Sequence, residues 1–234
     1  MRLGCDIDGV LADLETALLQ EAQRLFPASE PATGADTSTG AEAGSPLLEV
    51  EGDPVPVVKL PSLTSRQQEM LWREVRRIPN FWETLGEIES GAIARLASLA
   101  RAHRWEVVFL TSRPSTAGDL VQLQTQRWLE RLGYTLPSAF VVKGSRGKIA
   151  DALGLDVVID DRPENCLDVV SDSRARAILV WPSGTTDVPA SARRVQIGVV
   201  SGINACLDLL ADATRPDVPG TGLMARVRHL LGLS

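Results

Sequence analysis

The sequence predicts an α/β fold in which helices flank a parallel β-sheet, with a small, mainly helical cap inserted near the start. Short apolar runs alternate with segments of helical periodicity through most of the chain, which is typical of βαβ units. The alternation breaks between residues 14 and 88, so we expect this stretch to lie outside the sheet. The chain has 234 residues, 44% of them hydrophobic, which suits one main domain and a modest accessory one.

The predicted strands are short apolar runs, and the predicted core helices have apolar residues at helical spacing. Ser90 is a candidate N-cap, Gly133 and Gly154 each stop a helix, and Pro163 suits a first helical turn. The expected strands are residues 2–6, 106–111, 139–142, 156–160, 176–181 and a short one at 194–197. The expected helices are 90–103, 116–132 with Leu120, Leu123, Trp128 and Leu132 inward, 145–153, one from 163, and 203–210.

The inserted stretch, residues 14–88, is expected to form a cap between two parts of a core made of residues 1–13 and 89–213. It begins with a predicted helix at residues 14–25. Residues 27–56 are rich in Ala, Gly, Ser, Thr, Pro and Glu and cannot bury enough apolar surface to offset their ordering entropy. We therefore expect a mobile loop there. Thr64 and Gln67 then have the spacing of a capping box, which predicts a helix to about Arg77.

The last segment, residues 214–234, is expected to be a Pro/Gly linker followed by an amphipathic helix. One face of this helix would carry Leu223, Val227, Leu230 and Leu231. We expect it to dock on its own domain or on a second subunit, so a homodimer is one expected assembly. Attachment to a membrane surface is the less favoured alternative.

The composition excludes several classes of protein. A net charge of −6 argues against nucleic-acid binding, because such proteins carry a basic face. The three cysteines have no metal-ligand or redox spacing, and the two histidines, His103 and His229, each sit late in a predicted helix. No apolar stretch approaches the ~20 residues of a membrane span, and no signal segment is recognisable. We expect a soluble, cytoplasmic protein whose chemistry depends on carboxylates.

Polar residues occur at four places beside predicted strands, where ligands bind in open α/β sheets. Asp6 and Asp8 follow the first strand; Asp6 is the candidate nucleophile and Asp8 the candidate general acid and base. Thr111 and Ser112 follow the second and could bind a phosphoryl oxygen. Arg113 beside them could meet a substrate anion or form a surface ion pair.

The other two places supply a cation and a second acidic pair. Lys148 begins the helix that leads into the fourth strand and is preferred over Lys143 as the balancing charge. Asp160 and Asp161 end that strand and could converge with Asp6 on one cation. Clustered carboxylates repel each other unless a cation lies among them, and hard oxygen ligands select Mg²⁺.

The order of these segments resembles the four motifs of the haloacid dehalogenase superfamily, with its Rossmann-like sheet. Within it, the chain is most similar to the 5′(3′)-deoxyribonucleotidase family at residues 6–13, 79–85 and 159–165. The resemblance implies an aspartyl-phosphate mechanism at Asp6 and Asp8. It also implies phosphate ligands Thr111 and Lys148, and Mg²⁺ held by Asp6, Asp160 and the Asp8 carbonyl. In that family an aromatic cap pocket holds the base, which makes Phe81 and Trp82 candidate substrate contacts here.

The leading hypothesis is a Mg²⁺-dependent phosphomonoesterase that acts on a small phosphate ester, with nucleoside monophosphates first. A dehalogenase is disfavoured, because carbon–halogen chemistry needs neither Asp8 nor a metal. A non-catalytic protein that binds a phosphorylated ligand is the alternative from another class.

Overall fold

The computed structural model describes residues 1–27, 60, 63–182 and 197–214. A six-stranded sheet with strand order β3-β2-β1-β4-β5-β6 forms its centre, and all adjacent strands are parallel. The predicted α/β sheet is therefore confirmed. The last strand was expected at residues 194–197, of which 194–196 lie outside the described residues; the last described strand begins at Gly198. The strands are β1 (Arg2–Asp6), β2 (Glu106–Thr111), β3 (Ser138–Val141), β4 (Val157–Asp160), β5 (Arg176–Val180) and β6 (Gly198–Val200).

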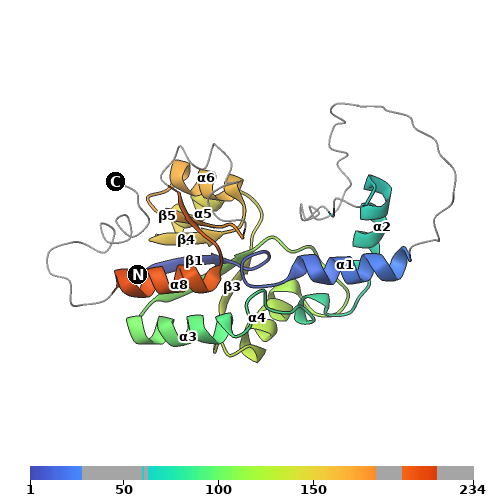
Figure 1. Cartoon of the computed structure of the whole chain (residues 1–234), viewed down its shortest axis with the longest axis horizontal. Coiled ribbons are helices and arrows are strands. Elements are labelled where there is room, and N and C mark those ends of the chain that lie inside the picture. The colour runs from blue at the N-terminus through green and yellow to red at the C-terminus, as the bar shows by residue number, and fades with distance from the viewer. Residues whose placement is uncertain (28–59, 61–62, 183–196, 215–234) are drawn as a thin grey trace.

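Helices cover both faces of the sheet (Figure 1). On one face, α3 (Ala92–His103), α4 (Val121–Arg131) and α8 (Ile203–Ala213) form a hydrophobic cluster with Leu3 and Cys5 of β1. On the other face, α5 (Arg146–Ala152) and α6 (Pro163–Asp172) pack on Val158 of β4 and Leu179 of β5. Because the inner strands are buried on both faces, they are continuous apolar runs rather than alternating ones. No helix in the described part of the chain is long and apolar enough to cross a membrane.

The inserted stretch forms α1 (Leu14–Leu25), α2 (Ser65–Val75) and the short 3₁₀ helix η1 (Phe81–Glu83), with α1 and α2 projecting beyond the sheet (Figure 1). The predicted capping box at the start of α2 is present: Thr64 Oγ1 accepts from the Gln67 N–H, and the Thr64 N–H donates to Gln67 Oε1 at 2.9 Å. Leu18, Trp72 and Trp82 belong to the same hydrophobic cluster as β1. Apart from Pro27 and Thr214, the predicted 27–56 loop and the C-terminal helix lie outside the described residues.

Two predicted helix starts differ from the structure. Gly91, not Ser90, precedes α3, and the Glu87 carboxylate accepts the N–H groups of Gly91 and Ile93 at 2.8 and 2.9 Å. The Glu87 carboxylate, from the segment just before the helix, thus replaces the Ser90 cap that the sequence suggested. The next helix, α4, begins at Val121 rather than at residue 116.

The inward face of α4 also differs from the prediction. Leu120 and Leu123 were expected inward and are 79% and 37% exposed. Gln124 and Thr125 are buried beside Trp128 and Leu129 instead. Periodicity counts apolar side chains and cannot recognise a polar side chain whose partners come from other segments. Here Gln124 donates to the Asp119 carbonyl at 2.6 Å and accepts the Trp82 N–H at 3.2 Å, so its burial is compensated.

Replacing Gly147 with Ala should destabilise the packing of α5 on α6. A Cβ at this position would overlap the carbonyl oxygen of Asp168 in α6. Overpacking of this kind costs about 1–3 kcal/mol, which denaturant unfolding would measure as a lower midpoint. Gly86→Ala is the matched control, because no heavy atom lies within 4 Å of its added Cβ. Equal midpoints for the two variants would show that α6 shifts to make room for the added Cβ without a loss of stability.

Candidate active site

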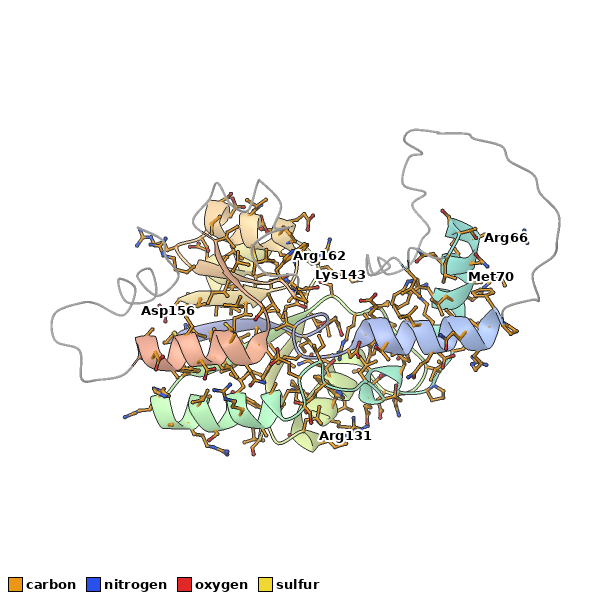
Figure 2. All side chains as sticks on the ribbon, in the orientation of Figure 1. Arg66, Met70, Arg131, Lys143, Asp156 and Arg162 are labelled. Atoms are coloured by element: carbon orange, nitrogen blue, oxygen red, sulfur yellow. The ribbon has the colours of Figure 1, made fainter. Side chains whose placement is uncertain are left out.

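Polar side chains that end three strands gather at the carboxyl edge of the sheet. Asp6 ends β1, Thr111 ends β2 and Asp160 ends β4. Because β1 lies between β2 and β4, the three side chains are neighbours at the middle of this edge. In Figure 2, Lys143, which follows β3, lies at the same edge, whereas Asp156, which precedes β4, lies at the opposite one. This is the edge at which ligands bind in open α/β sheets.

A buried arginine lies against the candidate nucleophile. Arg146 Nη2 donates to Asp6 Oδ1 at 2.6 Å, and Arg146 Nε lies 3.6 Å from Asp160 Oδ2. Asp6 and Arg146 are 7% and 4% exposed. Arg146 Nε and Nη1 are buried and make no hydrogen bond within the described part of the chain. A guanidinium with unused donors can bind the oxygen atoms of an anion, since such charge-assisted bonds are strong and bidentate.

The start of α5 explains the direction of Arg146. Ser145 is the N-cap, and its Oγ accepts the Lys148 N–H at 3.0 Å. Gly147 packs on α6, where its N–H donates to Asp168 Oδ2 at 3.0 Å. Lys148 is exposed, and its charge helps to lower the pKa of Asp168, after stronger effects from hydrogen bonds to that carboxylate. The structure therefore brings Arg146, and not Lys148, against Asp6.

Sequence reasoning missed Arg146 because it looked for a lysine in this segment. The signal that could have found it is Ser145, whose capping places residue 146 in the first helical position. A side chain there leans toward the helix N-terminus, and the loop before α5 crosses the sheet edge. The role of Lys148 as a phosphate ligand stays a prediction that this geometry does not support.

Burial and mutual repulsion raise the pKa values of the clustered carboxyls. Burial raises the pKa of Asp6 well above its ordinary value; the charge of Asp160 adds to this effect and that of Arg146 opposes it. Burial likewise raises the pKa of Asp160, again opposed by Arg146. Burial raises the pKa of Asp161 to about 7, with the charge of Asp160 as the second cause. Positive charge at this place therefore stabilises the ionised cluster.

The cluster fits a hard cation by its donor chemistry. Asp161 Oδ1 is buried without a hydrogen-bond partner among the described residues, and the charged groups that act on Asp161 are the carboxylates of Asp160 and Asp8 and the Arg162 guanidinium. Within the same residues, no three Asp, Glu, His or Cys side chains already have metal-binding spacing. In this structure the positive charge beside Asp6 and Asp160 comes from the Arg146 guanidinium. An orphaned carboxylate oxygen among further oxygen donors suits Mg²⁺, which Asp6, Asp160 and Asp161 would hold.

A tight turn after β1 carries Asp8. The Leu11 N–H donates to the Ile7 carbonyl at 2.8 Å, and Gly9 has a φ of 87°. This left-handed conformation favours glycine, and a Cβ at Gly9 would also overlap the Asp161 carboxylate. The glycine thus allows the turn and Asp161 to lie in contact. The predicted role of the Asp8 carbonyl as a metal ligand is untested by this geometry.

The Asp8 carboxylate accepts hydrogen bonds from two side chains. Thr111 Oγ1 donates to Asp8 Oδ2 at 2.9 Å, and Arg113 Nη2 donates to Asp8 Oδ1 at 2.8 Å. The Arg113 side chain is fully buried, so the structure does not place it where a substrate anion could reach it. Ser112 Oγ donates to the Val142 carbonyl at 3.1 Å and lies 3.4 Å from Arg146 Nη2. Among the predicted phosphate ligands, Thr111 and Ser112 are thus at the site.

The two candidate cap aromatics lie in the hydrophobic core. Phe81 and Trp82 are 2% and 0% exposed, and their rings pack edge to face at 5.1 Å. Trp82 Nε1 donates to the Pro114 carbonyl at 3.0 Å. This arrangement corrects the expectation that they offer a surface to the substrate. The sequence made them candidates because it does not distinguish an aromatic ring buried in the core from one that binds a ligand.

Comparisons with known proteins support the fold. No family model matches the sequence, and no curated protein matches it. A protein from Thermotoga maritima, provisionally named beta-phosphoglucomutase, is similar with a TM-score of 0.53 and 17% identity, over 90% of this chain and 98% of that one. A HAD family hydrolase from Deinococcus radiodurans R1, solved with bound phosphate and sodium, has a TM-score of 0.53 and 16% identity, over 90% and 95%. A hydrolase from Pseudomonas syringae has a TM-score of 0.51 and 14% identity, over 91% and 99%.

These likenesses show that the chain shares the α/β fold of these three proteins. At such low identity they show the fold alone, so any activity has to be argued from the residues of the site.

Proposed function

We propose that this chain is a Mg²⁺-dependent phosphomonoesterase that acts through an aspartyl-phosphate on Asp6. The observation that carries the proposal is the contact between buried Asp6 and buried Arg146, whose Nε and Nη1 make no hydrogen bond to the described residues, although Nε lies 3.6 Å from Asp160 Oδ2. Buried polar groups in proteins are nearly always hydrogen-bonded, so unused donors beside a carboxylate point to a bound ligand. A phosphoryl group supplies the oxygen atoms that these donors lack.

The residues of the site divide the reaction into two steps. An oxygen of Asp6 attacks phosphorus, the bond to the leaving oxygen breaks, and Asp8 donates a proton to that oxygen. Asp8 then takes a proton from water, which attacks the phosphoenzyme, releases inorganic phosphate and restores Asp6. Arg146 binds the phosphoryl oxygens throughout and balances their charge. Asp6, Asp160 and Asp161 would hold Mg²⁺, which would supply positive charge that shields the phosphate from the incoming carboxylate.

Nucleoside and deoxynucleoside monophosphates are the first substrates to test. The resemblance to 5′(3′)-deoxyribonucleotidases at residues 6–13, 79–85 and 159–165 supports this choice. The bound phosphate named for the Deinococcus radiodurans structure supports phosphate chemistry on this fold. Because Phe81 and Trp82 are buried, the residues that would contact a base come from elsewhere in the chain.

A panel of phosphate esters tests the proposal. The purified chain is assayed with nucleoside monophosphates, sugar phosphates and an aryl phosphate, with and without Mg²⁺, by release of inorganic phosphate. The proposal predicts Mg²⁺-dependent release that Asp6→Asn abolishes. Binding of the same compounds without turnover would instead indicate a non-catalytic phospho-ligand protein, although such a protein would have no use for Asp8.

Activity should require Mg²⁺ and be inhibited by Ca²⁺. Mg²⁺ prefers a tight octahedron, whereas Ca²⁺ accepts more ligands at longer distances and can bind both oxygens of one carboxylate. If Ca²⁺ takes both oxygens of Asp6, no free oxygen remains for attack on phosphorus. Initial rates in Mg²⁺ with increasing Ca²⁺ measure this effect. Full turnover in excess chelator would contradict the metal assignment.

A further inference from the structure

Arg113 has an environment unlike that of any other arginine in the described residues, because its side chain is fully buried between two tryptophans. Its guanidinium carbon lies 4.8 Å from the ring centroid of Trp82 and 5.6 Å from that of Trp128. Thr125 Oγ1 accepts from Arg113 Nη1 at 3.1 Å. Trp82 comes from η1 and Trp128 and Thr125 come from α4, so two separate segments hold this guanidinium in place.

The other donors of Arg113 all point to Asp8. Arg113 Nε lies 2.9 Å from Asp8 Oδ2 and 3.1 Å from Oδ1, and Nη2 lies 2.8 Å from Oδ1. A planar guanidinium that meets both carboxylate oxygens fixes the plane and the direction of the carboxylate, which a lysine cannot do. The Asp8 side chain is 17% exposed. The carboxylate is therefore held by Arg113 and Thr111 and is still partly accessible.

Building on the proposed function, we infer that Arg113 is a positioning residue that orients the Asp8 carboxylate for proton transfer and does not bind substrate. Its burial excludes contact with a substrate anion, because the tryptophans, Thr125 and Asp8 surround it. The inference also gives Trp82 and Trp128 a function: they hold Arg113 in one orientation. Proton transfer depends on geometry within hydrogen-bond reach, so a loosened carboxylate loses rate rather than substrate affinity.

Arg113→Lys tests this inference, because it keeps the positive charge and removes the planar guanidinium that meets both carboxylate oxygens. We expect kcat to fall by about 10²-fold, with KM close to wild type, since misplacement of a reacting group by ~1 Å costs about that much. The fall should be larger for an alkyl phosphate, whose leaving group needs a proton, than for an activated aryl phosphate. Arg127→Lys is the matched control: Arg127 is a half-exposed arginine of α4, paired with Asp119 and Glu83.

A double-mutant cycle with Asp8→Asn separates positioning from the other roles. If Arg113 acts only through Asp8, Arg113→Lys should change kcat little in the Asp8→Asn background. A similar loss in both backgrounds, or a raised KM, would overturn the inference and indicate substrate binding or general destabilisation. Thermal unfolding of each variant is measured alongside.

If Arg113→Lys does not fold, Thr125→Val takes its place in the cycle, because it removes the contact at the far end of the guanidinium and otherwise only the hydrogen bond from Thr125 Oγ1 to the Val121 carbonyl within α4. The same pattern is expected, with a smaller loss of kcat, and equal losses in both backgrounds would again overturn the inference. Failure of the proposed function gives a different result. If Asp8→Asn itself keeps wild-type turnover, Asp8 is not the proton-transfer group. If Asp8→Asn is impaired while Arg113→Lys is not, only the inference about Arg113 fails.

Discussion

Replacing Asp6 with Asn is expected to lower kcat on the order of 10⁴- to 10⁶-fold, because it removes the proposed nucleophile. The substitution is nearly isosteric, and Arg146 keeps an oxygen at this position as its partner. The loss should therefore appear in turnover, and unfolding midpoints are measured alongside it because Arg146 also loses the charge of a buried partner. Steady-state release of inorganic phosphate from a Mg²⁺-saturated sample measures it.

Asp13→Asn is the matched control for this variant. Asp13 is a carboxylate close to Asp6 in the sequence, but it caps α1 by accepting the Thr16 N–H at 3.0 Å. Asn and Asp are comparable N-caps, so activity and stability should stay close to wild type. Wild-type turnover of Asp6→Asn would show that the chemistry, if any, takes place elsewhere in the molecule.

Replacing Arg146 with Ala is expected to lower kcat by about 10²- to 10³-fold, while Lys148→Ala should leave kcat close to wild type. The first variant removes a preorganised donor that stabilises charge on the phosphoryl oxygens, a role worth ~3–4 kcal/mol. The second removes an exposed charge two residues further along α5, beside Asp168. Arg146→Lys should fall between wild type and Ala, because it keeps the charge but not the bidentate geometry.

Unfolding midpoints measured in Mg²⁺ accompany these rates, since Arg146 is buried beside Asp6 and Asp160. Removal of one partner of a buried ion pair destabilises a protein by itself. A large loss of kcat in Lys148→Ala together with a small loss in Arg146→Ala would contradict the assignment. It would support Lys148, as the sequence suggested, as the residue that balances the phosphoryl charge.

The sheet and the polar residues at its carboxyl edge could be predicted from the sequence because both depend on local patterns. A buried strand is a continuous apolar run, and a polar residue directly after it must lie at the carboxyl end. Asp6, Thr111 and Asp160 were placed correctly by this reasoning. Their convergence follows from the strand order, which puts β1 between β2 and β4.

The partners of these residues could not be predicted, because they depend on contacts between distant segments. Whether Arg146 or Lys148 faces Asp6 is decided by the packing of Gly147 on α6, which no local pattern reveals. Arg113 was expected to meet a substrate anion or to form a surface ion pair; its burial could not be predicted, since the tryptophans next to it come from η1 and α4. Thr125 was not among the predicted inward residues of α4, because periodicity counts apolar side chains; it is buried, and it accepts a hydrogen bond from Arg113.

The central claim is that Asp6 becomes phosphorylated, and the Asp8→Asn variant tests it most directly. This variant keeps the nucleophile and Arg146 but lacks the group that activates water, so an activated aryl phosphate should phosphorylate it faster than water removes the phosphate. Rapid quench into acid, intact-protein mass measurement and peptide mapping locate the added group. We predict one phosphate on the peptide that contains Asp6, and none when Asp6→Asn is combined with Asp8→Asn. A phosphate on any other residue, or an adduct that survives Asp6→Asn, would contradict the account.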